Sequence, residues 1–113
     1  MQKNRDLESL IDIHKAAQRV VRFSHNITKK TLLNDEKEIS AILYQITIIG
    51  EATKRLSMDY RQQHPEIPWR NLAGMRDVLI QEYDQIDLDI VWNVVHYEIP
   101  SLIERLEPLI PSE

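Results

Sequence analysis

The sequence predicts an all-α protein, and three observations support this class. Apolar residues recur three and four positions apart along most of the chain, which is the spacing of one face of a helix. The 113 residues include only two glycines, and no segment shows the alternating pattern of strands joined by a hairpin. Because 42% of the residues are hydrophobic, a chain of this length can bury one continuous core, and we expect a single domain over residues 1–113.

The first predicted helix covers residues 5–27. Asp6 and Glu8 lie near its N-terminal end, where the partial positive charge of a helix favours carboxylates. Its apolar stripe contains Leu7, Leu10, Ile11, Ile13, Ala17, Val20 and Val21. We expect this long helix to pack against the core along that stripe.

The second predicted helix begins after a polar stretch and runs to about Tyr60. Asn34 or Asp35 is placed to cap it, and Glu38 is placed to complete a capping box with Asp35. Gly50 lies within the apolar stripe, where glycine costs about 1 kcal/mol relative to alanine. We therefore expect another helix to cross closely at Gly50.

Two prolines and an aspartate predict where the remaining helices begin. Pro65 and Pro68 form a connector, and Pro68 suits the first turn of a third helix over residues 69–83. Asp87 can cap a fourth helix, which Pro100 should kink or split. The result would be a bundle of four or five helices.

Composition excludes several classes of function. The net charge of −4 and the pI near 5.5 disfavour stable non-specific binding of nucleic acid, although a local arginine-lined cleft remains compatible with them. The chain has no cysteine, which excludes thiolate metal sites and disulfides. Its four histidines are scattered, so we expect neither a metal nor another cofactor. Without a long apolar run, we expect a cytoplasmic protein that does not enter a membrane.

One predicted helix face carries several groups that could take part in chemistry. At about 100° per residue, Arg76 and Tyr83 share one sector of the third helix, while Asp77 and Gln81 form an i,i+4 pair on the neighbouring sector. A guanidinium, a carboxylate, an amide and a phenol would then lie together. Such residues are also ordinary on a solvated helix face, so their spacing alone does not identify an enzyme.

Longer motifs around this face resemble a known family. The stretch IIGEATKRL, followed by HPEIPWRNLAGMRDVLIQEYDQIDLDIVW, is similar to the HepT-like toxins of the HEPN superfamily over roughly residues 42–103. The resemblance implies a helical bundle that forms a homodimer and brings two copies of the motif together across a cleft. It also implies a metal-independent endoribonuclease acting on RNA, paired with a minimal nucleotidyltransferase antitoxin, MntA.

The resemblance also assigns roles to individual residues. Arg76 matches the motif arginine, Asp77 the polar position after it, and Tyr83 the motif tyrosine, which accepts AMP from the antitoxin. Gln81 stands at the position of the family histidine. An imidazole can exchange a proton near neutral pH and an amide cannot, so this chain should be impaired as a nuclease.

Two explanations of Gln81 remain open. The chain could be a natural degenerate member, or the histidine could have been replaced to make a toxic protein expressible; the persistence of Arg76, Asp77 and Tyr83 favours replacement. The alternative function is a catalytically silent HEPN domain that only binds a nucleotidyltransferase. A plain structural bundle would require the ordered motifs to be coincidental.

Overall fold

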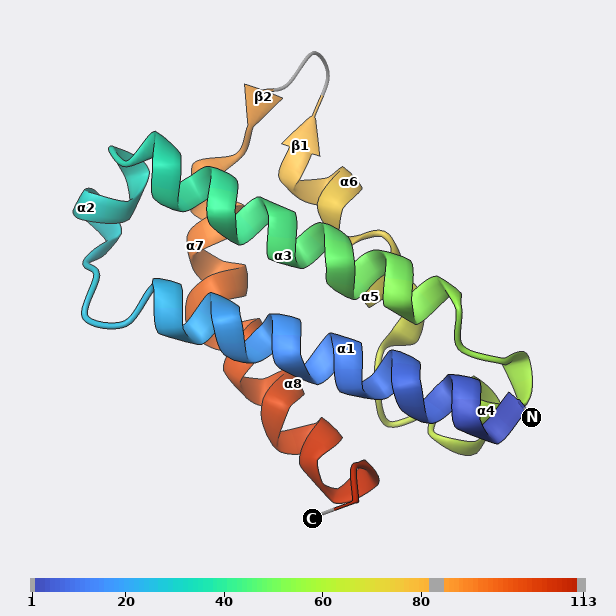
Figure 1. The fold of residues 1–113 in the computed structure, drawn as a ribbon. Helices are drawn as coiled ribbons and strands as arrows, with labels where there is room; N and C mark the ends of the chain where they lie inside the picture. The colour runs from blue at the N-terminus through green and yellow to red at the C-terminus, as the bar shows by residue number, and fades with distance from the viewer. Residues whose placement is uncertain (1, 82–84, 112–113) are drawn as a thin grey trace.

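The computed structural model describes residues 2–81 and 85–111 and confirms the helical class (Figure 1). In chain order the segments are α1 (Gln2–Phe23), α2 (Lys29–Leu33), α3 (Glu36–Lys54), α4 (Met58–Gln63), α5 (Trp69–Ala73), α6 (Met75–Leu79), β1 (Ile80–Gln81), β2 (Gln85–Ile86), α7 (Leu88–Asn93), the π-helix η2 (Val94–Glu98), α8 (Ile99–Leu106) and the 3-10 helix η3 (Glu107–Leu109). The long helices α1 and α3 run antiparallel and pack together. Helix α8 packs against α1, and α5 and α6 pack against α3.

The corner between α1 and α3 contains a short helix that the sequence analysis did not predict. Helix α1 ends at Phe23 rather than near residue 27, and Asn26 takes a positive φ of 62° that reverses the chain. Thr28 then caps α2 by accepting a hydrogen bond from the Thr31 N–H. The polar stretch is therefore partly helical.

The start of α3 confirms Asp35 as its cap, because the Glu38 N–H donates to Asp35 Oδ1 over 3.0 Å. The Asp35 N–H itself donates to the carbonyl of Leu32, so the reciprocal half of the predicted capping box is replaced by a backbone hydrogen bond. Partial burial raises the pKa of the Glu38 carboxyl, and the negative charge of Asp35 raises it further.

The second helix is shorter than predicted, because α3 ends at Lys54 and α4 begins only at Met58. Asp6 of α1, which is 5% exposed, accepts hydrogen bonds from the backbone N–H and the Oγ of Ser57 over 2.8 and 2.7 Å. The same Oγ caps α4 by accepting from the Tyr60 N–H. A contact with Asp6, near the N-terminus, thus holds the bend between α3 and α4.

The third helix is also interrupted, and the prediction of one helix over residues 69–83 is wrong. Gly74 separates α5 from α6 and donates its N–H to the carbonyl of Arg70. Helix α6 ends at Leu79, after which β1 pairs antiparallel with β2, with Ile80 opposite Ile86. β-branched residues favour such pairing. This small ladder turns the chain back toward α7.

The last helical run confirms two predictions. Asp87 caps α7, since its Oδ1 accepts from the Ile90 N–H over 3.1 Å. Pro100 follows the π-helical turn η2, which separates α7 from α8. Proline lacks an N–H and its ring crowds the carbonyl four residues earlier, so a wider turn relieves the conflict.

The buried side chains form one continuous cluster. Its largest fully buried members are Leu10, Ile13, Val20, Leu32, Ile42, Ile46, Ile49, Ile67, Leu79, Val91, Ile99 and Leu106. Trp69 is an anchor of this core, at 5% exposed, and its indole N–H donates to the carbonyl of His64. Across the described residues, no helix combines the length and apolar character needed to cross a membrane.

Candidate functional site

The close crossing of α3 and α5 positions the candidate site. A Cβ atom on Gly50 would lie 3.2 Å from the carbonyl oxygen of Ala73 and 3.5 Å from that of Leu72. This confirms the predicted crossing, because a Cβ atom at this position would be crowded by the backbone of α5. Glu51 follows Gly50 directly, and α6 begins two residues after Ala73. The last turns of α3 and the start of α6 are thereby held next to each other.

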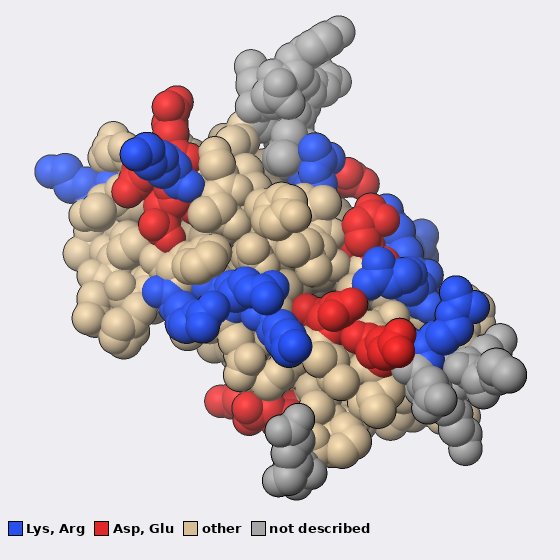
Figure 2. All heavy atoms as spheres, viewed as in Figure 1, with Lys and Arg blue, Asp and Glu red and all other residues tan. Residues whose placement is uncertain are grey.

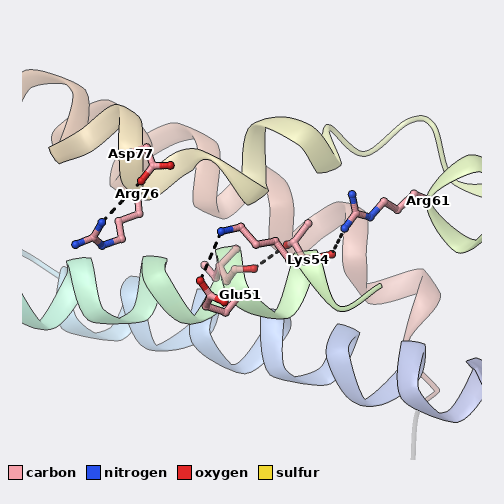
Figure 3. Close-up of polar contacts among 7 residues, drawn as sticks. Glu51, Lys54, Arg61, Arg76 and Asp77 are labelled. Atoms are coloured by element: carbon pink, nitrogen blue, oxygen red, sulfur yellow. Dashed lines mark hydrogen bonds and ion pairs between the residues drawn. The ribbon is translucent and has the colours of Figure 1, made fainter. Parts of the chain in front are cut away.

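Arg76 and Asp77 lie on α6, where their side chains are exposed by 49% and 79% (Figure 3). Arg76 Nη1 lies 3.8 Å from Asp77 Oδ1, beyond hydrogen-bond distance. An ion pair this exposed contributes about 0–1 kcal/mol. The guanidinium can therefore leave Asp77 for a phosphate at little cost, and Figure 3 shows its side chain extending from α6 toward α3.

Figure 3 also shows three charged residues, on α3 and α4, that the sequence did not single out. Lys54 Nζ lies 3.6 Å from Glu51 Oε1 at the end of α3. Arg61 of α4 donates from Nη2 to the carbonyl of Thr53 over 2.7 Å, which ties α4 to the end of α3. Glu51 and Lys54 belong to the IIGEATKRL motif, so that motif could have signalled them. Nothing in the local sequence around Arg61 could have.

Gln81 does not share a helix with Arg76 and Asp77. It lies in β1, and its pairing partner is Gln85 of β2. The predicted i,i+4 relation between Asp77 and Gln81 is therefore wrong, because α6 ends at Leu79. Tyr83 lies outside the described residues. The helical sector predicted to be shared by Arg76 and Tyr83 therefore also falls outside the described residues.

The histidines occupy separate parts of the fold. His14 Nε2 lies 3.6 Å from Glu107 and His64 Nδ1 lies 3.5 Å from Glu66, so each faces a single carboxylate. His96 stacks on Trp92 with ring centroids 4.8 Å apart. Within residues 2–81 and 85–111, no three histidine, aspartate or glutamate side chains are grouped in a way that could hold a metal ion.

Comparison with known proteins adds a finding to this geometry. The family described as Ribonuclease HepT-like matches residues 13–109. A protein of Thermococcus cleftensis named "Probable ribonuclease HepT" is 40% identical over 100 residues, which cover 88% of this chain and 91% of that protein. A protein of Methanocaldococcus jannaschii named "Putative RNase" is 35% identical over 107 residues, covering 94% of this chain and 88% of the relative. No solved structure gave a significant match.

Proposed function

Because this chain belongs to the HepT-like ribonuclease family, we propose that its function is that of a HepT-type toxin: a metal-independent endoribonuclease controlled by a nucleotidyltransferase antitoxin. The observation that carries the proposal is the half-exposed guanidinium of Arg76, held beside α3 and only loosely paired with Asp77. It lies within the matched region. Arginine in this setting suits the recognition of a phosphate.

The reaction that suits these residues is transesterification within RNA. The ribose 2′-oxygen forms a bond to the adjacent phosphorus as its proton is removed, and the bond from phosphorus to the 5′-oxygen breaks with protonation of that oxygen. Arg76 stabilises the charge that develops on the phosphoryl oxygens. A protein of net charge −4 needs local positive charge where an RNA phosphate binds, and Arg76 supplies it here. No metal or cofactor is required on this route.

Gln81 limits this activity in the chain as it stands. The family histidine would move the proton, and glutamine can only hydrogen-bond to the phosphate or ribose. Losing one general acid or base costs about 10²- to 10⁴-fold in rate. We therefore place Arg76, Asp77 and Gln81 in the site, with Gln81 as the impaired member.

Regulation completes the proposal. Two copies form a homodimer that unites two motifs across a cleft. The cytoplasmic MntA-like antitoxin transfers AMP from ATP to the hydroxyl of Tyr83, with release of pyrophosphate and of the phenol proton. The adenylate would bring a negative phosphate to the arginine site and exclude RNA from it. The proposal rests here on the family to which the chain belongs.

The test is to restore the histidine. Gln81→His should cleave a mixed RNA substrate in EDTA, and Arg76→Ala added to it should abolish that cleavage. If the Gln81→His protein is folded and dimeric but remains as inactive as the parent chain, the ribonuclease proposal fails.

The second candidate, a silent domain that only binds a nucleotidyltransferase, is favoured by one observation: Gln81 lacks a titratable group. It would be supported by tight binding of the nucleotidyltransferase together with an inactive Gln81→His variant. Restored cleavage would exclude it.

A further inference from the structure

Basic residues are concentrated in one part of this acidic chain. Residues 13–34 contain five of the 14 lysines and arginines, and all 18 aspartates and glutamates lie outside this segment. The segment forms the second half of α1, the corner after it and α2. A polyanion that is repelled by the protein as a whole would therefore meet a local region of opposite charge here.

Three of these five residues form a stripe along α1, which we call the α1 stripe: Lys15, Arg19 and Arg22. Spacings of four and three positions place them on one side of the helix, over about 10 Å of its length. Lys15 and Arg22 are exposed, and Arg19 is half-buried. In the view of Figure 1, Figure 2 shows basic groups gathered over this half of α1 and acidic groups over the other half.

Within residues 2–81 and 85–111, the structure pairs none of the three α1-stripe residues with a carboxylate. The acidic residue that precedes the stripe on α1 is Asp12, and its carboxylate is paired with Arg55 over 3.2 Å. Arg19 donates from Nη1 to Gln45 Oε1 over 3.3 Å. This neutral partner orients the guanidinium without cancelling its charge, so the stripe offers three cations to a ligand.

The phosphate backbone of a nucleic acid suits this arrangement. Cations spaced along a line can contact successive phosphates of one strand, and such contacts need no particular base sequence. A second copy of the chain is a poor occupant of the stripe. A two-fold axis passing through it would set cations against cations, which opposes the contact.

The α1 stripe and Arg76 lie on either side of α3. Helix α3 packs between α1 and α6 (Figure 1), and Arg76 extends from α6 toward α3 (Figure 3). Packed helix axes are about 8–10 Å apart, so α1 and α6 are separated across α3 by up to about 16–20 Å. Tyr44 is 66% exposed on α3, and its ring can stack with a base of a strand that crosses this helix.

We propose that the α1 stripe binds the phosphates of the RNA strand to one side of the bond that is cleaved. A strand held by the stripe crosses α3 beside Tyr44 and reaches Arg76. The inference rests on the proposed function and extends it, because it makes the preferred substrate a single strand of several nucleotides. A dinucleotide is too short to reach from Arg76 to the stripe. No bond forms or breaks at the stripe, which only holds the strand.

Binding of a labelled oligouridine tests the stripe, and the chain with Gln81 suits this measurement because its proposed impairment limits cleavage. The triple variant Lys15→Gln, Arg19→Gln, Arg22→Gln releases fewer counterions when it binds. The slope of the logarithm of affinity against the logarithm of salt concentration should therefore become shallower by about 0.7 for each cation removed. At about 0.1 M salt, the triple variant should bind about 100-fold more weakly. Fluorescence anisotropy over a range of salt concentrations measures both quantities.

The matched control removes the same amount of charge elsewhere. Arg5→Gln, Lys37→Gln and Arg70→Gln change three residues that are exposed and lie outside the α1 stripe. This control should leave the salt slope close to that of the parent protein, because only cations that contact phosphates release counterions. Equal changes in the control and in the triple variant would overturn the proposal.

A double variant guards against a loss of folding. Lys15→Gln with Arg22→Gln leaves the contact between Arg19 and Gln45 in place, and both changed residues are exposed. Its salt slope should become shallower by about two thirds of the change seen in the triple variant. An unchanged slope in this folded double variant would overturn the proposal.

Tyr44→Ala tests the path across α3. Stacking on an aromatic ring is not ionic, so this variant should bind the same RNA about tenfold more weakly with an unchanged salt slope. Parent-like affinity in Tyr44→Ala would contradict a strand that crosses α3 beside Tyr44.

Cleavage in the Gln81→His background separates the stripe from the ribonuclease proposal. There the triple variant should raise KM more than it lowers kcat, and its loss in kcat/KM should grow with the length of the RNA. A parent-like KM on long RNA would overturn the stripe and leave the ribonuclease standing. An inactive Gln81→His protein, beside a triple variant that has lost RNA binding, would support the stripe and overturn the ribonuclease. Normal RNA binding by the triple variant, with weakened binding of the nucleotidyltransferase, would assign the stripe to an acidic protein surface and overturn the proposal.

Discussion

Arg76 is the residue whose chemistry is most specific to the proposed site. In the Gln81→His background, we expect Arg76→Ala to lower the rate of RNA cleavage by about 10²- to 10³-fold, because the developing phosphoryl charge loses its fixed cation. The cleavage rate of Arg76→Lys should lie between the rates of the arginine and alanine proteins, since an ammonium keeps the charge without the planar fork of donors. Arg70→Ala, on exposed Arg70 of α5, is the control. A full rate with Arg76→Ala would remove Arg76 from the site.

Tyr83 is the residue through which the antitoxin is proposed to act. Incubation with the cognate nucleotidyltransferase, ATP and magnesium should add the mass of AMP to the chain, and Tyr83→Phe should abolish the addition. Tyr97→Phe is the control, because Tyr97 is 61% exposed and therefore open to modification. Labelling that persists in Tyr83→Phe would place the acceptor elsewhere.

Tyr60 gives a prediction about pH. Partial burial, followed by the charges of Asp6 and Glu66, raises the pKa of its phenol above the ordinary 10.0. Folding then favours the neutral phenol, so this contribution to stability is present below pH 10 and is lost as the pH rises through the folded pKa. As the pH is raised from about 9 to 11, the free energy of unfolding measured in urea should fall less for Tyr60→Phe than for the parent protein. An identical loss in both proteins would contradict the assignment.

At the level of elements, local signals predicted the starts of helices better than their ends. Asp35 and Asp87 cap α3 and α7 through hydrogen bonds to a residue three positions away, which a sequence pattern can reveal. The end of α3 depends instead on Asp6, which is 51 residues from Ser57 in the chain. The β1–β2 ladder likewise interrupted a stretch whose periodicity favoured a helix.

The bend between α3 and α4 should depend on Asp6. Asp6→Ala leaves the Ser57 N–H and hydroxyl without their charged acceptor in a buried place, and we expect a loss of about 1.5–3 kcal/mol in the free energy of unfolding. Asp12→Ala, on the same helix, is the control. Asp12 forms a half-exposed ion pair with Arg55, so its removal should cost less than about 1 kcal/mol. Equal losses in chemical denaturation would contradict this account.

The crossing of α3 and α5 should depend on Gly50. Any Cβ there would press on the Ala73 carbonyl, which is backbone and cannot rotate away. Gly50→Val should therefore lower the free energy of unfolding by about 1–3 kcal/mol, as overpacking does in other cores. This loss is expected even though valine has a higher helix propensity than glycine. Gly74→Ala is the control, because a Cβ there would meet its nearest atom at an ordinary 3.7 Å. A stable Gly50→Val protein would show that the crossing can relax.

For the whole molecule, the sequence predicted the helical class and the core stripes because both follow from periodicity. The sequence also pointed to the family, through the motifs that resemble it, and the family match over residues 13–109 confirms that resemblance. The roles of Arg76 and Asp77 in the site stay a proposal. The packing of α6 against α3 could not be predicted, because it depends on a helix crossing. The common helix predicted for Arg76 and Gln81 was wrong. The helical spacing of apolar residues continues past Leu79, but there α6 ends and β1 pairs with β2.

The central claim is that this fold cleaves RNA by attack of the RNA's own ribose 2′-hydroxyl, without a metal. Mass spectrometry of the products that Gln81→His releases from a defined RNA in EDTA tests it most directly. The account predicts 2′,3′-cyclic phosphate or 3′-phosphate ends opposite 5′-hydroxyl ends, because the 2′-oxygen is the attacking group. Products with 5′-phosphate and 3′-hydroxyl ends, or cleavage only when a divalent metal is added, would contradict it.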